Sequence, residues 1–152
     1  MDSYQELSAT AGLWQSHASG AVVQYDPNLL DGPVSLIATL THELMHDIHA
    51  PFCDTVPSGE EAHELGTDLH CITTGQGLNQ TMAAEYTGWI GYLRQPTRGY
   101  ALALFLPATG RPIDAGSAWL QPRPLRYLRR ADREIATFTV RLASLSARLG
   151  EA

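Results

Sequence analysis

Two histidines and a glutamate at fixed spacing constrain the fold of this chain more than any other feature. His42, Glu43 and His46 form the pattern His-Glu-x-x-His within a segment, 33–50, that the pattern predicts to be helical. Positions four apart share one face of a helix, so both imidazoles can reach the same metal ion. Glu43 lies beside them and is suited to take a proton from water that the metal activates. The sequence therefore predicts a metal centre built on a helix, with Glu43 as general base.

The residues around the motif predict the limits and the faces of this helix. Asp31 is a candidate N-cap, with Pro33 in the first turn, and Pro51 should end the helix after Ala50. The apolar residues project opposite to the histidines, so we expect their face to pack into the core. These apolar residues are Leu36, Ile37, Leu40, Leu44 and Ile48.

A second helix, predicted over 59–74, offers a third ligand. Its start fits a capping box, with Ser58 as N-cap and Glu61 three residues later. Catalytic zinc sites typically have three protein ligands and keep one position for water. Glu64 and Asp68 lie one turn apart, so Glu64 can bind the metal while Asp68 orients a ligand histidine. The alternative is that these acids form a solvated helix face.

Taken together, these motifs resemble the gluzincin type of zinc metallopeptidase, and more closely an uncharacterised family of bacterial HExxH-motif proteins. The resemblance covers about residues 20–130. It implies a zincin-like fold with His42, His46 and Glu64 as zinc ligands, Glu43 as base and Asp68 as the carboxylate behind a ligand histidine. The stretches that carry it are 36–46 (LIATLTHELMH), 63–69 (HELGTDL), 74–77 (TGQG), 91–96 (GYLRQP) and 99–105 (GYALALF).

Several further side chains are candidates for contact with a substrate. His49 shares the histidine face, but it lies about 10 Å along the axis from His42 and is not expected to join the same metal. Arginines could bind a substrate carboxylate, and tyrosines could stabilise an oxyanion. Core packing or simple surface exposure is the alternative for each. The candidates are His49, Tyr92, Tyr100, Arg94 and Arg98.

Three residues of the second helix have two interpretations each. His63 and His70 share a stripe, which indicates either a second metal site or, as the favoured interpretation, two solvated histidines. Cys71 lies on the face of Glu64 and Asp68. It could be a thiolate ligand, but the favoured interpretation is a small buried residue.

Charge divides the chain into two unlike halves. Residues 1–93 hold 12 of the 16 acids, all six histidines and no Lys or Arg, whereas 94–152 hold all 10 arginines. The net charge of −6 argues against a nucleic-acid partner. The sequence has no apolar run near ~18 residues, no signal-peptide pattern and only two cysteines. We therefore expect no membrane partner and a cytoplasmic location.

The element pattern predicts a mostly α (α+β) fold, a single compact zincin-like domain over 1–152 with a small N-terminal sheet. The half 1–93 would carry the metal, and the half 94–152 would be helical and arginine-rich. The last helix has an apolar stripe through Ile135 and Phe138 to Leu149. We expect this stripe to pack on its own domain, with a homo-oligomer seam as the alternative. The expected strand is 21–25, and the expected helices are 3–15, 33–50, 59–74, 81–93, 96–106 and 125–149.

Three functions agree with these residues. The first is a zinc-dependent hydrolase of metallopeptidase type, with Glu43 as base. The second is a metalloenzyme that acts on a small molecule, for example in biosynthetic tailoring, with Fe²⁺ or Mn²⁺ as alternatives to Zn²⁺. The third is a non-catalytic, metal-stabilised binding module. The partner is thus a peptide or a small-molecule substrate in the first two.

Overall fold

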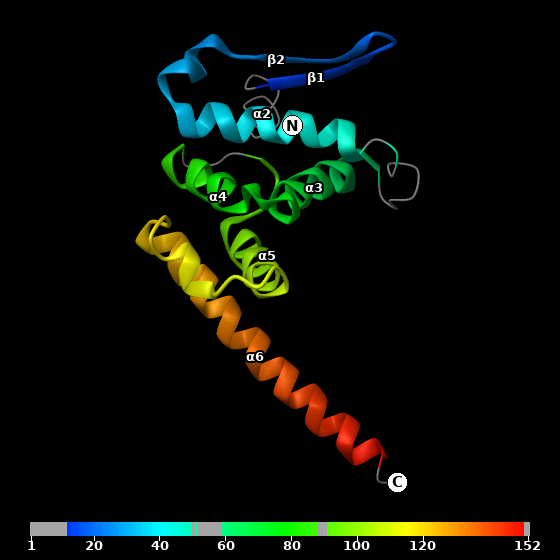
Figure 1. Cartoon of the computed structure of the whole chain (residues 1–152), viewed down its shortest axis with the longest axis vertical. Helices are drawn as coiled ribbons and strands as arrows, with labels where there is room; N and C mark the ends of the chain where they lie inside the picture. The colour runs from blue at the N-terminus through cyan, green and yellow to red at the C-terminus, as the bar shows by residue number, and fades with distance from the viewer. Residues whose placement is uncertain (1–11, 50, 52–58, 88–90, 151–152) are drawn as a thin grey trace.

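The chain is mostly helical, with one small antiparallel sheet at its N-terminal end (Figure 1), which confirms the predicted mostly α (α+β) class. The computed structural model describes residues 12–49, 51, 59–87 and 91–150. In order, the elements are β1 (Gly12–His17), β2 (Gly20–Tyr25), the 3-10 turn η1 (Pro27–Asp31), α2 (Pro33–His49), α3 (Gly59–Cys71), the π-turn η3 (Ile72–Gln76), α4 (Gly77–Tyr86), α5 (Gln95–Ala108), the 3-10 turn η4 (Ile113–Gly116) and α6 (Pro122–Gly150).

The sheet is a hairpin of β1 and β2 that lies along α2 (Figure 1). Its register runs from the pair Gly12–Tyr25 to the pair His17–Gly20, and Gly20 has a φ of +130° that suits a tight turn. The strand predicted over 21–25 is confirmed. The helix predicted over 3–15 is wrong for 12–15, because these residues pair with β2; residues 3–11 lie outside the described residues.

Helix α2, which carries the His-Glu-x-x-His pattern, begins and ends within a residue of its predicted limits. The Leu36 N–H donates to the Gly32 carbonyl, so Gly32 occupies the N-cap position. Asp31, the predicted N-cap, instead ends the preceding 3-10 turn. The helix ends at His49, just before Pro51.

The other helices keep their predicted order but differ in their limits. α3 ends at Cys71 because the backbone then turns through Gly75, whose φ of +94° is not helical. Gly77 returns to helical angles, so α4 begins four residues before the predicted Thr81 and ends at Tyr86. α5 includes Pro107, which was expected to end it, because proline is tolerated in the last turn when the Thr109 N–H still bonds to Phe105.

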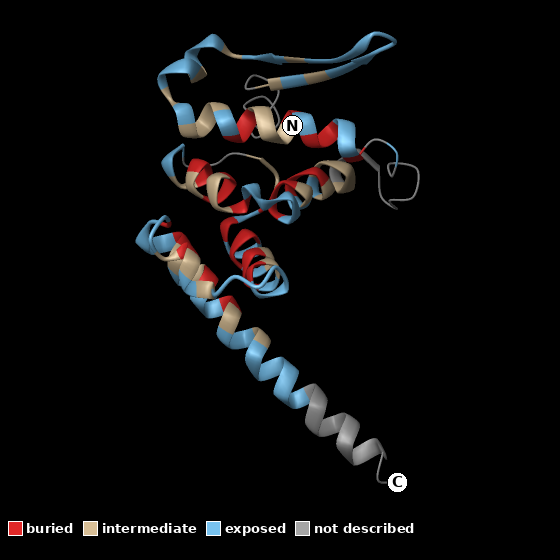
Figure 2. Ribbon diagram, viewed as in Figure 1, coloured by how far each residue is buried: buried red, intermediate tan, exposed pale blue. Residues whose placement is uncertain are grey.

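The main hydrophobic core lies between α5 and α6 and is closed by the start of the π-turn (Figure 2). Its buried residues are Ile72, Leu93, Leu102, Ala103, Leu106, Leu120, Leu128 and Ala131. The part of α6 beyond this core extends away from the rest of the molecule (Figure 1). Ile135 packs against the core as expected, but Phe138 is 59% exposed, so the predicted packing of the stripe on its own domain fails there.

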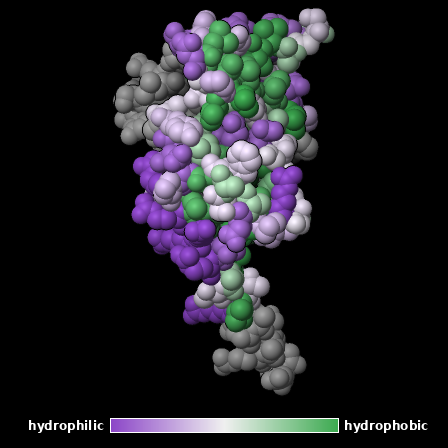
Figure 3. Space-filling view, turned by 60° about the vertical axis from the view of Figure 1, so that its left-hand side comes forward, coloured by the Kyte–Doolittle hydropathy of each residue, from purple (hydrophilic) through white to green (hydrophobic). Residues whose placement is uncertain are grey.

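The apolar face of α2 is largely exposed, contrary to the prediction, and only Leu36 and Leu40 on it are partly buried. Ile37, Leu44 and Ile48 are each about half exposed, whereas Glu43, His46 and His49 are buried. Figure 3 shows hydrophobic surface gathered over the upper part of the molecule, at the level of the hairpin and α2. The reason is that α3 packs against the histidine face of α2, so the polar face becomes the interior one. No helix in the described residues is long and apolar enough to cross a membrane.

Candidate metal centre

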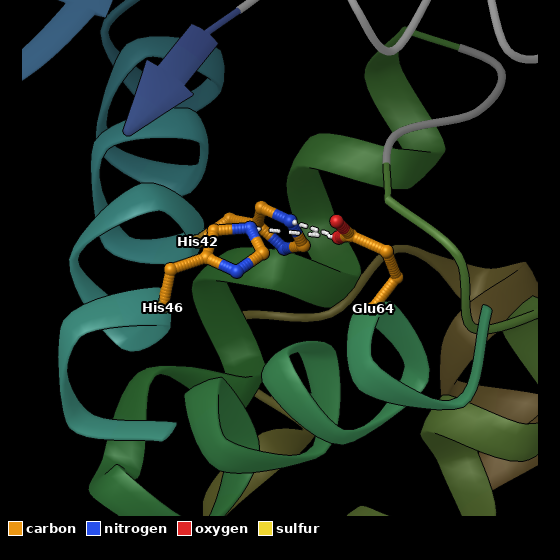
Figure 4. Close-up of side chains that lie close together, drawn as sticks. All are labelled: His42, His46 and Glu64. Atoms are coloured by element: carbon orange, nitrogen blue, oxygen red, sulfur yellow. Dashed lines mark hydrogen bonds and ion pairs between the residues drawn. The ribbon is translucent and has the colours of Figure 1, made fainter. Parts of the chain in front are cut away.

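His42, His46 and Glu64 converge where α2 and α3 pack together (Figure 4). The Glu64 Oε2 atom lies 3.1 Å from His42 Nε2 and 3.5 Å from His46 Nε2. Ligand atoms 2.0–2.1 Å from a tetrahedral zinc ion lie about 3.3 Å apart, so these spacings fit such an ion. The three residues predicted from the sequence can therefore hold a metal ion, with two nitrogens and one carboxylate oxygen as donors.

Local helix geometry explains why these side chains meet. His42 and His46 are one turn apart on α2 and project to the same side. Glu64 projects from α3 towards both rings (Figure 4). All three side chains are between 11% and 17% exposed, so the centre is largely but not completely shielded from solvent.

Asp68 holds the first histidine in place, as the spacing predicted. Its Oδ1 atom lies 2.9 Å from His42 Nδ1, which leaves Nε2 directed at Glu64. Its Oδ2 atom accepts hydrogen bonds from the backbone N–H groups of Tyr92 and Leu93, at 2.6 and 2.7 Å. Because a ligand histidine is oriented through its second ring nitrogen, Asp68 fixes the direction of Nε2, the atom of His42 that could bind a metal.

Arg98 supports Asp68 and does not face a substrate, which corrects the prediction for this residue. Its side chain is fully buried, with Nη2 3.1 Å from Asp68 Oδ2 and Nε donating to the Leu93 carbonyl. A fully buried arginine of this kind has no access to a substrate carboxylate. The only sequence signal for such a role is a single arginine at the start of an otherwise apolar helix.

Gly91 is a second residue whose role the sequence did not reveal. Its φ is +73°, and a Cβ atom there would lie 2.6 Å from Asp68 Oδ1 and 2.7 Å from Arg98 Nη2. Only glycine combines this backbone conformation with the space that the buried ion pair needs. The loop before α5 thus closes over Asp68 because residue 91 lacks a side chain.

Strand β1 covers the general-base candidate. Glu43 is only 8% exposed, and a Cβ atom on Gly12 would lie 2.8 Å from its Oε1 atom. The Trp14 backbone donates a hydrogen bond to Glu43, and the Trp14 ring stacks on His46 at 6.1 Å between ring centroids. Burial raises the pKa of Glu43 above its usual value, which the nearby His42 partly offsets. Gly12 and Trp14 were not predicted at the site, because the sequence pattern predicts a helix over 3–15 and these residues lie in β1 instead.

The ligand side chains differ in their protonation. Burial lowers the pKa of His46 to about 4, so its ring is neutral and able to bind a metal. Burial also lowers the pKa of His42, but the hydrogen bonds of this ring to Asp68, Cys71 and Glu64 have the larger effect. The pKa of His42 is therefore raised well above the usual value. Burial opposes ionisation of Glu64, yet the hydrogen bond with His42 and the nearby His46 bring its pKa below normal. A metal at this centre would therefore compete with protonation of His42, because the raised pKa of that ring favours its charged form.

The remaining candidates fall in different places. Tyr92 lies at the centre, with its ring stacked on His42 at 6.0 Å between centroids. His49 is buried and faces His63 and His70, not the three ligands. Arg94 is exposed at the start of α5. Cys71 is a free, fully buried thiol, which agrees with the favoured interpretation as a small buried residue, and it forms a hydrogen bond with His42.

Tyr100 lies in a separate groove between α3, α5 and α6. The groove has a volume of about 850 Å³ and is mostly apolar, with Leu69, Leu104 and Tyr127 in its walls. Its described lining includes none of the three ligands. The structure therefore does not bring Tyr100 to the metal centre.

Comparison of the chain with models of protein families, with curated proteins and with solved structures finds no match. The resemblance to gluzincins stays a prediction that rests on the motifs.

Proposed function

We propose that this protein is a zinc-dependent hydrolase of metallopeptidase type, with Glu43 as general base. The observation that carries the proposal is the pairing of a two-histidine, one-carboxylate ligand set with a further buried carboxylate next to it on the same helix. Two histidines and a glutamate are a donor set that catalytic zinc sites of peptidases use. When bound, Zn²⁺ lowers the pKa of a bound water to about 7 and polarises a carbonyl oxygen.

Glu43 is suited to move a proton during such a reaction. Burial raises the pKa of Glu43 towards neutral pH. A general base or acid transfers protons most effectively when its pKa is near the pH of the reaction. A carboxylate oxygen of Glu43 would take a proton from water as that water attacks the carbonyl carbon. The same oxygen would then return the proton to the leaving amine, so the carboxylate is restored.

The position of β1 supports a peptide as substrate. Within the described strands, β1 pairs with β2 along one edge and has no strand partner on the other, and its Trp14 backbone donates a hydrogen bond to Glu43. An extended peptide can add to such an edge through main-chain hydrogen bonds. Because β1 has six residues, the bound segment would be short.

Trp14 also offers a donor for the substrate. Its indole Nε1 is buried and has no hydrogen-bond partner within the described part of the chain, beside the His46 ring. A donor placed near the reacting carbonyl stabilises the charge that develops on its oxygen. Trp14→Phe should then lower kcat more than it raises KM.

The test compares Glu43→Gln with Asp47→Asn, a carboxylate that is exposed on the same helix. Zinc content and hydrolysis of a fluorogenic peptide library would be measured for both variants. We expect Glu43→Gln to keep its zinc and lose turnover by about 10²-fold or more, whereas Asp47→Asn matches the wild type. Full turnover in Glu43→Gln would rule out this mechanism.

A small-molecule metalloenzyme is the second candidate, and the low exposure of the ligand side chains favours it. A two-histidine, one-carboxylate set also suits Fe²⁺ in oxygen chemistry. Metal analysis of protein purified with and without air would separate the two. Stoichiometric zinc, with no iron- or manganese-dependent activity, would remove these alternatives. A non-catalytic module predicts instead that Glu43→Gln leaves the biological function intact.

A further inference from the structure

Five histidine side chains of α2 and α3 follow one another in an unbroken row. The ring centroids are 4.9 Å apart for His42 and His46, 5.2 Å for His46 and His63, 4.7 Å for His63 and His49, and 4.7 Å for His49 and His70. The first two belong to the metal centre. The other three, His49, His63 and His70, are half of the six histidines of the chain and have no role in the proposed hydrolysis.

The end of this row brings two imidazole nitrogens into close contact. His49 Nδ1 and His70 Nδ1 are 3.0 Å apart, from two different helices. Such a pair is attractive either when one nitrogen donates a proton to the other, or when both bind one cation. The distance is near the about 3.3 Å expected between two ligands of a tetrahedral ion.

The surroundings are built to hold these rings. His49 is 4% exposed and packs over Gly66, where a Cβ atom would lie 3.0 Å from the His49 Cε1 and Nε2 atoms. Burial, with smaller effects of His70 and His63, lowers the pKa of His49, which favours the neutral form that a metal requires. His70 is only partly buried, so water and ions can reach the pair.

His63 adds a third imidazole beside the pair. Its Nε2 atom is buried and has no hydrogen-bond partner in the described residues. A buried polar atom without a partner costs about 1–3 kcal/mol of stability. A bound ion or water at His63 Nε2 would remove this cost. His63 and His70 are seven residues apart on α3, or about 10 Å along its axis, so His63 would have to turn towards the pair to bind the same ion.

We propose that His49 and His70 form a second, weaker site for a divalent transition-metal ion, with His63 as the nearest further ligand. Imidazole pairs bind Zn²⁺, Ni²⁺ and Cu²⁺, and water completes the coordination. With two firm protein ligands against three, the site is weaker than the centre at His42, His46 and Glu64. The proposal concerns metal binding alone and stands whether or not the protein is a hydrolase.

The experiment is a Zn²⁺ titration of the full chain by calorimetry, with metal content measured after gel filtration. The wild type should bind two equivalents, one tight and one weak. His70→Gln should weaken the second equivalent by at least about 10-fold and keep the first. His42→Gln should weaken the first equivalent and keep the second. His17 is exposed on the hairpin, so His17→Gln should keep both equivalents.

Folding is controlled by circular dichroism of each metal-free variant. His70 is the primary target because it is partly exposed, and Cu²⁺ electron paramagnetic resonance of the His42→Gln variant gives a second readout. Nitrogen hyperfine splitting in that variant, lost on adding His70→Gln, supports the site. One equivalent of Zn²⁺ in both the wild type and His70→Gln would overturn the proposal and leave the 3.0 Å contact as a hydrogen bond between helices.

Discussion

Arg98 and Asp68 form an ion pair from which solvent is wholly excluded. Their Nη2 and Oδ2 atoms are 3.1 Å apart, and both side chains are 0% exposed. Burial opposes the charge of Asp68, but hydrogen bonds from His42 and the Leu93 backbone, together with Arg98, keep its pKa below the usual value. The pair therefore connects the scaffold of α5 to His42, a candidate metal ligand, through a carboxylate that stays ionised.

Loss of the cation should destabilise the fold strongly. Arg98→Met leaves Asp68 buried without its charged partner, and breaking a buried pair in this way costs about 3–5 kcal/mol. Urea denaturation would measure the change in free energy of unfolding. Arg94→Met, an exposed arginine four residues earlier, is the control and should change stability by less than about 0.5 kcal/mol. Equal stability of the two variants would contradict the role assigned to Arg98.

The carboxylate behind His42 should control metal affinity. Asp68→Asn keeps the size of the side chain but weakens its hydrogen bond to His42 Nδ1. Loss of such a partner typically lowers metal affinity by about 10–100-fold. Competition with a zinc chelator would measure the dissociation constant, with Asp47→Asn as a matched exposed control. An unchanged constant in Asp68→Asn would show that His42 needs no such support.

Two glycines with nearly equal backbone angles allow strain and crowding to be separated. Gly91 and Gly110 have φ values of +73° and +72°, but only Gly91 has atoms within 4 Å of an added Cβ. Gly110→Ala should cost about 1–3 kcal/mol, from backbone strain alone. Gly91→Ala should cost clearly more, because its Cβ meets Asp68 and Arg98. Thermal denaturation of both variants checks this, and equal losses would argue against crowding at residue 91.

Removal of the metal should lower the melting temperature. A ligand that binds only the folded state adds about 4 kcal/mol of stability at 1,000 times its dissociation constant. Addition of a chelator to the zinc-loaded protein should therefore shift Tm downwards. Glu64→Gln should reduce this shift, whereas the exposed Glu134→Gln should retain it. A shift of full size in Glu64→Gln would exclude this carboxylate as a ligand.

The exposed apolar face of α2 should tolerate truncation. Leu44 is 51% exposed, whereas Leu102 in the main core is 1% exposed. Leu102→Ala should cost about 2–5 kcal/mol, and Leu44→Ala much less, since only part of its surface is removed from water. Calorimetric unfolding would compare them. Similar losses would mean that the α2 face is covered by another part of the chain or by a partner.

Local periodicity accounts for what the sequence by itself determined. His42 and His46 share a face because they are four apart on a helix, and the same spacing relates Glu64 to Asp68. The β-branched residues at Val22 and Val23 indicate a strand without reference to the rest of the chain. Each of these features depends on neighbours within one or two turns, so the residues that meet at the candidate metal centre could be predicted from short motifs.

Only the tertiary structure decided which faces are buried and what supports the site. Hydrophobic periodicity identified two faces of α2 correctly, but it could not show that α3 covers the polar one. Arg98 and Gly91 meet Asp68 across 30 and 23 residues of chain, and β1 reaches Glu43 across about 30. Such contacts depend on how the elements pack and on the cost of leaving buried charges without partners, neither of which leaves a periodic signal in the sequence.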